Sequence, residues 1–464
     1  MISISNRKSD DTIIAEFTYS YDPTYWGKNG TRTRVIENIL KPDGNRISAQ
    51  VDYEYDDLYR LVHEHRIAYN GGDPGVAYEY NFAYDAAGNR TQWQVVGGTT
   101  TYYHCDPANK LLDFGPSDTY PYTGNAVLTY DDKGNTLTET NGSVTTTYTW
   151  DYLNRLTQWQ KTGETTQTYV YNADGVRVRV TPSGGTATNF LLDGGEVAEE
   201  ITGVSVTAYI APGLICRISG EDRSVYHADG LGSTRAMSDE DEDVAAYAAY
   251  SAYGSLLVGS ASESGYAGQH RYYADATGLD YLKARYYNPA VGRFISKDPI
   301  GYGGGLNTYD YVSNNPVGHV DPSGLLPTIN CPNNPNIGKV RTAISNICDA
   351  LNNGKMDRCP RCTTGPKQLQ CLKDFCNRGT IQCGSRECVA NPTWCGHAPW
   401  HPGVQKPGDR IVICNLSFAP GQCEGNIPGH PVTDTLLHEM MHACGSDDPA
   451  AGNKAGACIG EMLK

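Results

Sequence analysis

Short runs of β-branched and aromatic residues follow one another through the first 180 residues, a pattern typical of β-strands. Runs such as Thr145–Trp150 and Thr168–Tyr171 combine β-branched and aromatic residues, which fit a pleated surface. Clusters of Gly, Asn and Asp separate the runs and favour turns. Helical periodicity is absent until about residue 240, where Glu242–Tyr250 is a short run that fits either element. The pattern predicts a mainly β fold.

A short motif recurs among these runs. It consists of an aromatic residue, an acid or amide, and a short turn that often contains Gly, and its copies begin at Tyr55, Tyr84, Tyr130, Trp150 and Tyr171. One strand–turn–strand unit cannot bury its apolar face alone, whereas stacked copies can, as in solenoids. We therefore expect residues 1–297 to form a β-shell of stacked strand–turn–strand units.

Charge and composition narrow the class of protein. The net charge of −15 argues against a chain that coats nucleic acid or an anionic membrane. Residues 326–464 are nearly neutral, with 13 Lys and Arg against 11 Asp and Glu. No apolar run is long enough to span a bilayer, and the N-terminus lacks the apolar core of a signal peptide. Because the sequence starts directly in repeat-like residues, we expect it to be the tail of a longer gene product.

Cysteine usage divides the chain in two. Cys105 and Cys216 are the two cysteines of the first 325 residues, and 13 more lie between Cys331 and Cys458. Such density is typical of a disulfide scaffold in an oxidising compartment. The competing interpretation is structural zinc, for which Cys359-Pro-Arg-Cys362 is a natural half-site. Because 13 is odd, at least one thiol is expected to be free or to pair elsewhere.

The change in composition follows residues 298–325, DPIGYGGGLNTYDYVSNNPVGHVDPSGL. Each DPxG taken alone is ordinary turn chemistry. The whole stretch, however, resembles the C-terminal core motif of Rhs/YD-repeat proteins, which are similar in turn to the C components of insecticidal Tc toxin complexes. Tyr226–Arg235 and Thr277–Phe294 resemble the segments that lead into this motif, and the earlier repeats resemble YD repeats. The resemblance covers roughly residues 50–325.

The resemblance implies that residues 298–325 end a β-shell and that residues 326–464 form a variable toxin. It also implies an intramolecular aspartyl protease, formed by Asp298 and Asp321, that cuts between Leu325 and Leu326. Two carboxylates that share one proton can act as acid and base on a peptide bond. Related C components tend to carry a basic residue before the second aspartate, where this chain has Val320. Arg285 or Arg293 is expected to supply the missing charge.

A second candidate site lies in the tail, where His438, Glu439 and His442 form an HExxH motif in an apolar stretch. Asp434 is a suitable N-cap and Gly445 a suitable helix stop. Residues four apart share one helix face, so both imidazoles can bind one Zn²⁺ while Glu439 acts as general base. The motif resembles zincin metallopeptidases. It predicts a small α+β, disulfide-rich, zincin-like domain with zinc endopeptidase activity.

Two residues compete as the third zinc ligand. Asp448 completes HExxHxxGxxD, which matches the short metzincin pattern with Asp in place of its last His. Glu461 has the spacing of the gluzincin ligand and is favoured, because a bridge between Cys444 and Cys458 would hold the two helices together. A rival metal pair, His397 and His401, is separated by a helix-breaking proline.

These features predict a toxin that is secreted or delivered to a target cell. We expect a protein substrate there, a cognate immunity protein, and a secretion-system or upstream shell component. We expect no nucleic-acid partner and no stable membrane insertion. One alternative is a cell-surface, glycan-binding YD-repeat protein with a non-catalytic Cys-rich tip. The other is a nuclease toxin, which the near-neutral tail without a basic aromatic stripe disfavours.

Overall fold

The computed structural model describes residues 2–21, 32–193, 196–210, 214–260, 262–301 and 306–325, together with the backbone of four short strands further on. The chain divides into two compact units. The first unit comprises Met1–Asp22, Thr31–Pro299 and Asn307–Gly324, and the second comprises Pro23–Gly30, Ile300–Leu306 and Leu325–Lys464. Each unit is described by itself below.

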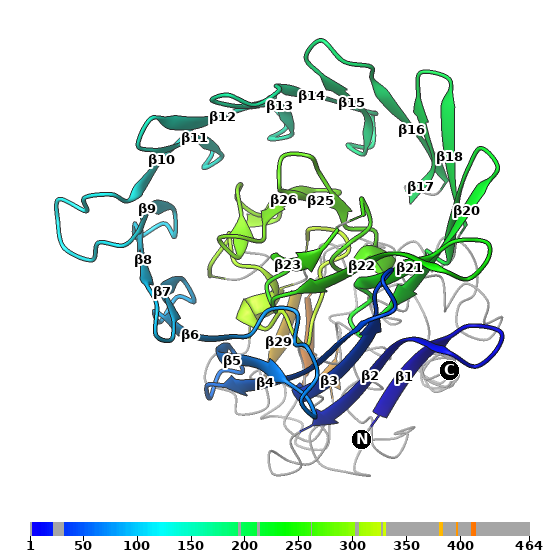
Figure 1. Ribbon diagram of the computed structural model, residues 1–464. Helices are drawn as coiled ribbons and strands as arrows, with labels where there is room; N and C mark the ends of the chain where they lie inside the picture. The colour runs from blue at the N-terminus through cyan, green and yellow to red at the C-terminus, as the bar shows by residue number, and fades with distance from the viewer. Residues whose placement is uncertain are drawn as a thin grey trace. The chain divides into compact units, whose positions relative to one another are not determined.

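The first unit is built on one sheet of 23 strands (Figure 1). Strands that are adjacent in the chain pair antiparallel throughout, from β1–β2 to β22–β23. The strands are β1 (Ile2–Arg7), β2 (Ile13–Tyr21), β3 (Arg32–Leu40), β4 (Arg46–Tyr55), β5 (Leu61–Ala68), β6 (Tyr78–Tyr84), β7 (Arg90–Val95), β8 (Thr100–Cys105), β9 (Leu111–Gly115), β10 (Ala126–Tyr130), β11 (Thr136–Asn141), β12 (Val144–Trp150), β13 (Leu156–Lys161), β14 (Gln167–Tyr171), β15 (Arg177–Pro182), β16 (Thr188–Asp193), β17 (Glu196–Thr202), β18 (Ser205–Ile210), β19 (Cys216–Ser219), β20 (Asp222–Ala228), β21 (Thr234–Ser238), β22 (Val244–Tyr250) and β23 (Leu256–Gly259).

The mainly β prediction is confirmed for the part of the chain that the structure describes. The run Glu242–Tyr250, which fitted either element, forms strand β22 from Val244 onward. This strand pairs with β21 and β23, so strand partners on both sides decide an element that local sequence left open.

The repeated motif forms a turn that its own acid stabilises. Asp85 accepts hydrogen bonds at Oδ1 from the amides of Ala87 and Asn89, at 2.9 and 2.8 Å. Asn89 then donates to Asp85 Oδ2 at 2.9 Å and to Asn109 in the following turn, 106–110, at 2.8 Å. The same bonds recur between Asp131, Asn135 and Asn154. The acid therefore fixes its own turn, and the residue four positions later links that turn to its neighbour.

Strands near the two ends of this sheet contact each other through side chains. Glu37 on β3 accepts an ion pair from Arg235 on β21 at 2.8 Å, and its other oxygen pairs with Arg66 at 2.6 Å. Around them, buried residues of β2–β4 form one apolar cluster with Ala236 and Val244. Burial of the Glu37 charge is tolerated because both of its oxygens are paired.

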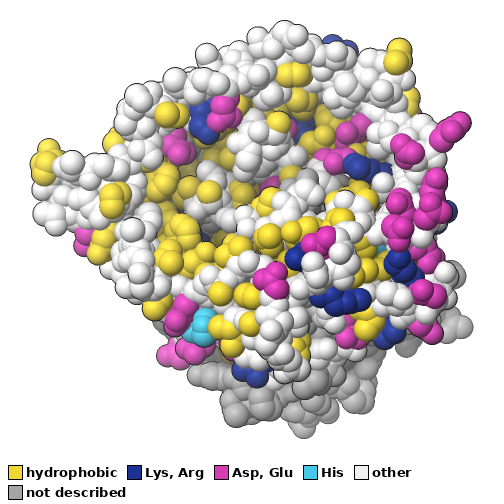
Figure 2. All heavy atoms as spheres, viewed as in Figure 1, with side chains coloured by type: hydrophobic (Ala, Val, Ile, Leu, Met, Phe, Trp, Pro, Cys, Tyr) yellow, Lys and Arg dark blue, Asp and Glu magenta, His cyan; other side chains and the backbone are white. Residues whose placement is uncertain are grey.

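Residues 262–299 and 307–324, termed the inner segment, lie on the concave side of the curved sheet (Figure 1). They contain the 3₁₀ turns η1 (Gly268–His270) and η3 (Val312–Asn314) and a small antiparallel sheet of β24 (Tyr273–Ala274), β25 (Asp280–Leu282), β26 (Arg285–Asn288) and β27 (Arg293–Phe294). Hydrophobic side chains gather between this segment and the sheet (Figure 2). Tyr281 and Tyr286 there join a buried cluster with Tyr148, Trp159 and Tyr169.

Repeat turns hold the inner segment through hydrogen bonds as well. Asn307 donates to Asn89 at 2.9 Å, Asn314 donates to the carbonyl of Gly88 at 2.8 Å, and Tyr309 donates to the carbonyl of Gly134 at 2.7 Å. Tyr side chains suit this role because each buries a large ring while its hydroxyl reaches a polar partner.

In the second unit the structure describes four strands by their backbone: β28 (Thr328–Asn330), β29 (Thr380–Cys383), β30 (Gly396–His397) and β31 (Arg410–Ile413). Pairs β28–β29 and β29–β31 are parallel and β30–β31 is antiparallel. The predicted helices and disulfides of residues 326–464 lie outside the described residues and stay predictions. Among the helices that the structure describes, none is long and apolar enough to cross a membrane.

Candidate functional site

The structure brings the two predicted aspartates together around one arginine. Asp298 follows β27, and its amide is held by the carbonyl of Thr308 at 2.8 Å. Asp321 opens a turn in which the amide of Gly324 bonds back to the Asp321 carbonyl at 3.2 Å. The Nη2 atom of Arg285, on β26, lies 2.9 Å from Asp298 Oδ2 and 3.3 Å from Asp321 Oδ2. Both carboxylates therefore reach the same guanidinium nitrogen.

These three charged side chains are almost fully buried. Their exposed fractions are 3% for Arg285, 4% for Asp298 and 1% for Asp321. Two buried carboxylates would repel each other strongly, and the guanidinium between them offsets that repulsion. The Arg285 guanidinium carbon also lies 3.5 Å from the centre of the Phe294 ring, a cation–π contact that stabilises the buried charge.

Of the two candidate arginines, Arg285 and not Arg293 contacts the aspartates. Arg293 instead donates to Cys105 Sγ at 3.3 Å and to the carbonyl of Asn109, and it stacks over Tyr309. The sequence left this choice open because both arginines are far from Asp321 in the chain and no local pattern links either one to it. The fold resolves it by pairing β25 with β26.

The same arginine also contacts the chain next to the predicted cut. Arg285 donates through Nε to the carbonyl of Gly324. The amide of Ala284 donates to the carbonyl of Ser323 at 3.1 Å. The turn that ends at Gly324 is thus held one residue before the Leu325–Leu326 bond. Leu326 itself lies outside the described residues.

Two buried tyrosines support Asp321 and were missed by the sequence analysis. The hydroxyl of Tyr272 accepts the Asp321 amide hydrogen bond and lies 2.8 Å from the hydroxyl of Tyr311. Burial, with the nearby Asp321 charge, raises the pKa of Tyr272 well above its ordinary value. Both hydroxyls therefore act as neutral hydrogen-bonding groups. The 33 tyrosines against seven Phe were the available signal, but composition does not say which hydroxyls matter.

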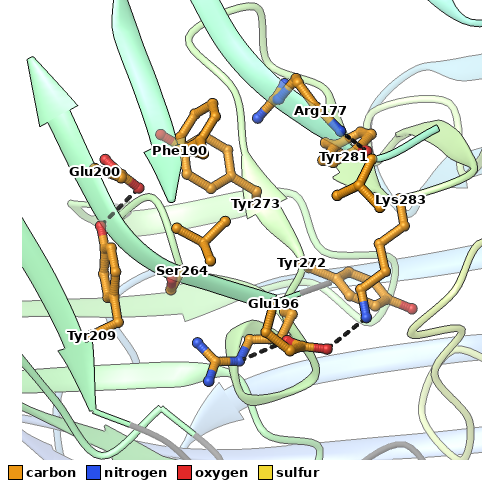
Figure 3. A pocket seen from close by; sticks show the side chains of 13 residues that line it. Arg177, Phe190, Glu196, Glu200, Tyr209, Ser264, Tyr272, Tyr273, Tyr281 and Lys283 are labelled. Atoms are coloured by element: carbon orange, nitrogen blue, oxygen red, sulfur yellow. Dashed lines mark hydrogen bonds and ion pairs between the residues drawn. The ribbon is translucent and has the colours of Figure 1, made fainter. Parts of the chain in front are cut away.

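A separate pocket of about 530 Å³, counted with its solvent-open mouth, lies elsewhere in the first unit (Figure 3). Its walls are largely aromatic and include Phe190, Tyr209, Tyr273 and Tyr281. No prediction from the sequence pointed to it.

The charged groups of this pocket pair with one another. Glu196 contacts Lys283 at 2.6 Å and Arg271 at 3.0 Å, and Tyr209 donates to Glu200 at 2.8 Å (Figure 3). Arg177 pairs with Asp275 on the inner segment. Such internal pairing joins the sheet to the inner segment, so we treat the pocket as part of that junction.

The residues of the predicted metal site are not among those that the structure describes. His438, Glu439, His442, Asp448 and Glu461 all fall outside the described residues. Among the residues that are described, no group of three or more His, Cys, Asp or Glu side chains is arranged to hold a metal ion. The Zn²⁺ ligands therefore stay a prediction.

No family model matches the chain. It is 31% identical over 271 residues to the tRNA3(Ser)-specific nuclease WapA of Bacillus spizizenii, a match that covers 54% of this chain and 11% of that protein. It is 42% identical over 108 residues to the double-stranded DNA deaminase toxin A of Burkholderia cenocepacia, covering 22% of this chain and 7% of the relative. The chain thus spans about a tenth or less of the length of these relatives.

A solved structure of TcdB2-TccC3-TEV is also similar, with a TM-score of 0.48 and 19% identity. That match covers 69% of this chain and 19% of the other. The sequence relatives, a nuclease and a deaminase toxin, support the toxin class that the core motif implied.

The same relatives correct three predictions. They are named for activity on tRNA and DNA, so the zinc endopeptidase prediction is wrong, and so are the predictions of a protein substrate and of no nucleic-acid partner. HExxH fixes three positions, and that spacing also arises without metal chemistry. A net charge summed over residues 326–464 does not report where Lys and Arg gather on a folded surface.

Proposed function

We propose that this chain belongs to a delivered toxin whose β unit cuts its own backbone between Leu325 and Leu326. Asp298 and Asp321 are the acid–base pair, and Arg285 holds them in place. One observation carries the proposal: a single buried guanidinium contacts both carboxylates and also the Gly324 carbonyl, one residue before that bond.

The reaction is hydrolysis by one water molecule. One aspartate, as a carboxylate, takes a proton from water as the water oxygen bonds to the carbonyl carbon of Leu325. The other aspartate, protonated, gives its proton to the nitrogen of Leu326 as the C–N bond breaks. The products are a carboxyl group on Leu325 and an amine on Leu326. The pair ends with one proton again, so two adjacent carboxyl groups are sufficient.

Burial decides which substrate this pair can use. Asp298 and Asp321 are at most 4% exposed, so a peptide in solution cannot reach them. The turn Asp321–Gly324 is already in contact with Arg285 in the folded chain. The site is therefore suited to cut its own chain once, at an entropic advantage over a separate substrate.

Asparagine substitution tests this proposal. Asp298→Asn or Asp321→Asn keeps the size of the side chain but removes an acid–base group, so either variant should run as one band near 50.5 kDa on a denaturing gel. The unaltered chain should run as two fragments. Asp280→Asn is the matched control, because Asp280 is a buried aspartate of the same inner segment outside the pair, and it should still be cut. Two fragments from Asp321→Asn would contradict the proposal.

A second proposal concerns residues 326–464, which we propose to act on nucleic acid. The support is the named activity of relatives, a tRNA nuclease and a DNA deaminase toxin. The purified, cut chain should fragment tRNA or convert bases in double-stranded DNA, read by gel and by sequencing. Heat-denatured chain is the control. Unchanged tRNA and unchanged DNA, at protein concentrations where self-cutting is complete, would contradict this proposal without touching the first.

A further inference from the structure

We infer that the cut lies at a fixed number of residues after Gly324, because contacts of the turn between β25 and β26 hold the main chain at Gly324 in place. This inference rests on the proposed self-cutting and adds how one bond is selected. The contacts that position the turn Asp321–Gly324 are made to its backbone atoms. The bond to be cut is therefore selected by its distance along the chain from Gly324, and not by the identity of the side chains beside it.

The β25–β26 turn contacts two successive carbonyls of the segment. Leu282 and Arg285 pair across this hairpin, with Lys283 and Ala284 between them. The amide of Ala284 donates to the Ser323 carbonyl at 3.1 Å, and Arg285 Nε donates to the Gly324 carbonyl. Two adjacent bonds of this kind fix both the position and the direction of the segment, as a paired strand would.

Gly324 lets the hairpin come this close. Its φ is +69°, and a Cβ atom there would lie 2.6 Å from the Leu282 carbonyl oxygen and 3.0 Å from the Arg285 amide nitrogen. Both neighbours are backbone atoms, so they cannot move aside as a flexible side chain would. Any larger residue at position 324 must therefore push the turn Asp321–Gly324 away from the hairpin that carries Arg285.

The same arginine links the position of Gly324 to the position of the acid–base pair. Arg285 contacts the Gly324 carbonyl with Nε and both aspartates with Nη2. The guanidinium is planar and rigid, so a fixed Gly324 carbonyl is at a fixed distance from both carboxylates. In this proposal the bond that is cut is the one that follows the next residue of the chain, Leu325.

Insertion of one alanine into the full chain tests the inference by denaturing mass spectrometry. With Ala inserted between Gly324 and Leu325, the cut should follow the inserted Ala, and the tail fragment should gain the mass of one Leu. With Ala inserted between Leu325 and Leu326, the cut should still follow Leu325, and the tail should gain the mass of one Ala. A cut that stays between the two leucines in the first variant, or loss of cutting in either variant, would overturn the inference.

Two glycine substitutions separate close contact from backbone strain. Gly278 has a φ of +78° in the β24–β25 turn, with nothing within 4 Å of a Cβ atom there. Gly278→Ala should be cut at the rate of the unaltered chain, whereas Gly324→Ala should be cut on the order of 100-fold more slowly. Equal rates for these two variants would contradict the inference. If the unaltered chain is itself not cut, the proposed function fails. If the unaltered chain is cut but the variants do not behave as described, the role of Gly324 alone fails.

Discussion

Two sets of aspartates in this chain show how differently local and long-range structure are encoded. Asp85 and Asp131 in the repeat turns accept hydrogen bonds from residues two to four positions further on. Asp298 and Asp321 meet at Arg285, which is 36 residues from Asp321 in the chain. The repeat aspartates therefore serve turns that a short sequence can specify. The paired aspartates exist as a site only when the inner segment is folded.

The strongest test of this contrast changes the arginines. Arg285→Lys keeps the charge but replaces a planar fork by a point charge, which cannot contact both carboxylates and the Gly324 carbonyl together. We expect self-cutting to slow on the order of 100-fold or more, followed by denaturing gel during cell-free synthesis. The matched control is Arg60→Lys, because Arg60 pairs with Asp56 within a repeat turn at 2.6 Å. Equal slowing in both variants would contradict the contrast between the paired aspartates and the repeat aspartates.

A repeat aspartate should affect stability and leave self-cutting intact. Asp131→Ala removes two hydrogen bonds, both 2.8 Å long, from the amide and side chain of Asn135. We expect a loss of about 1–2 kcal/mol, measured as a lower unfolding temperature with unchanged fragments. Asp132→Ala, in the exposed next position of the same turn, is the control. If Asp131→Ala abolished cutting, the repeat turns would be part of the site.

The smallest expected effect comes from Asp280, a buried aspartate that belongs to neither set. Burial, with a minor contribution from Asp275, raises its pKa from 3.8 to about 8, and its Oδ2 atom has no hydrogen-bond partner among the described residues. The folded chain therefore holds a proton that the unfolded chain releases near pH 4. This contribution to stability is full at low pH and is lost as the pH rises to about 8.

Asp280→Asn should reduce the fall in unfolding temperature between pH 6.5 and pH 8, by a few degrees, because Asn is neutral throughout. Glu64, with a pKa raised by burial to about 7, contributes a fall of the same sign and remains in the variant. His227 acts in the opposite sense, but below pH 6.5, because burial lowers its pKa to about 4. An equal fall in variant and unaltered chain would show that Asp280 is ionised in the folded state.

The sequence predicted those features that short segments determine. The repeats at Tyr84 and Tyr130 indicated strands and turns, because each turn is completed by its own Asp and the residue four positions later. Asp298 and Asp321 were found through the core motif, which records a family pattern and not a geometry. Arg285 was one of two open choices, since no local pattern links it to Asp321.

Other features could not be predicted, for physical reasons. Tyr272 and Tyr311 are two of 33 tyrosines, and burial in the inner segment, not sequence, distinguishes them. For the tail, HExxH predicted a peptidase because three fixed positions were taken as a metal site. The relatives instead point to nucleic acid. The HExxH spacing can occur in many helices, so on its own it is weaker evidence for a site than the contacts of Arg285 with both aspartates.

The most direct test of the central claim is the intact mass of the unaltered chain under denaturing conditions, with Asp321→Asn beside it. We predict two masses for the unaltered chain, one ending at Leu325 and one beginning at Leu326, and a single mass near 50.5 kDa for Asp321→Asn. A single intact mass for the unaltered chain would contradict the account, as would a cut in the same place when Asp321 is replaced.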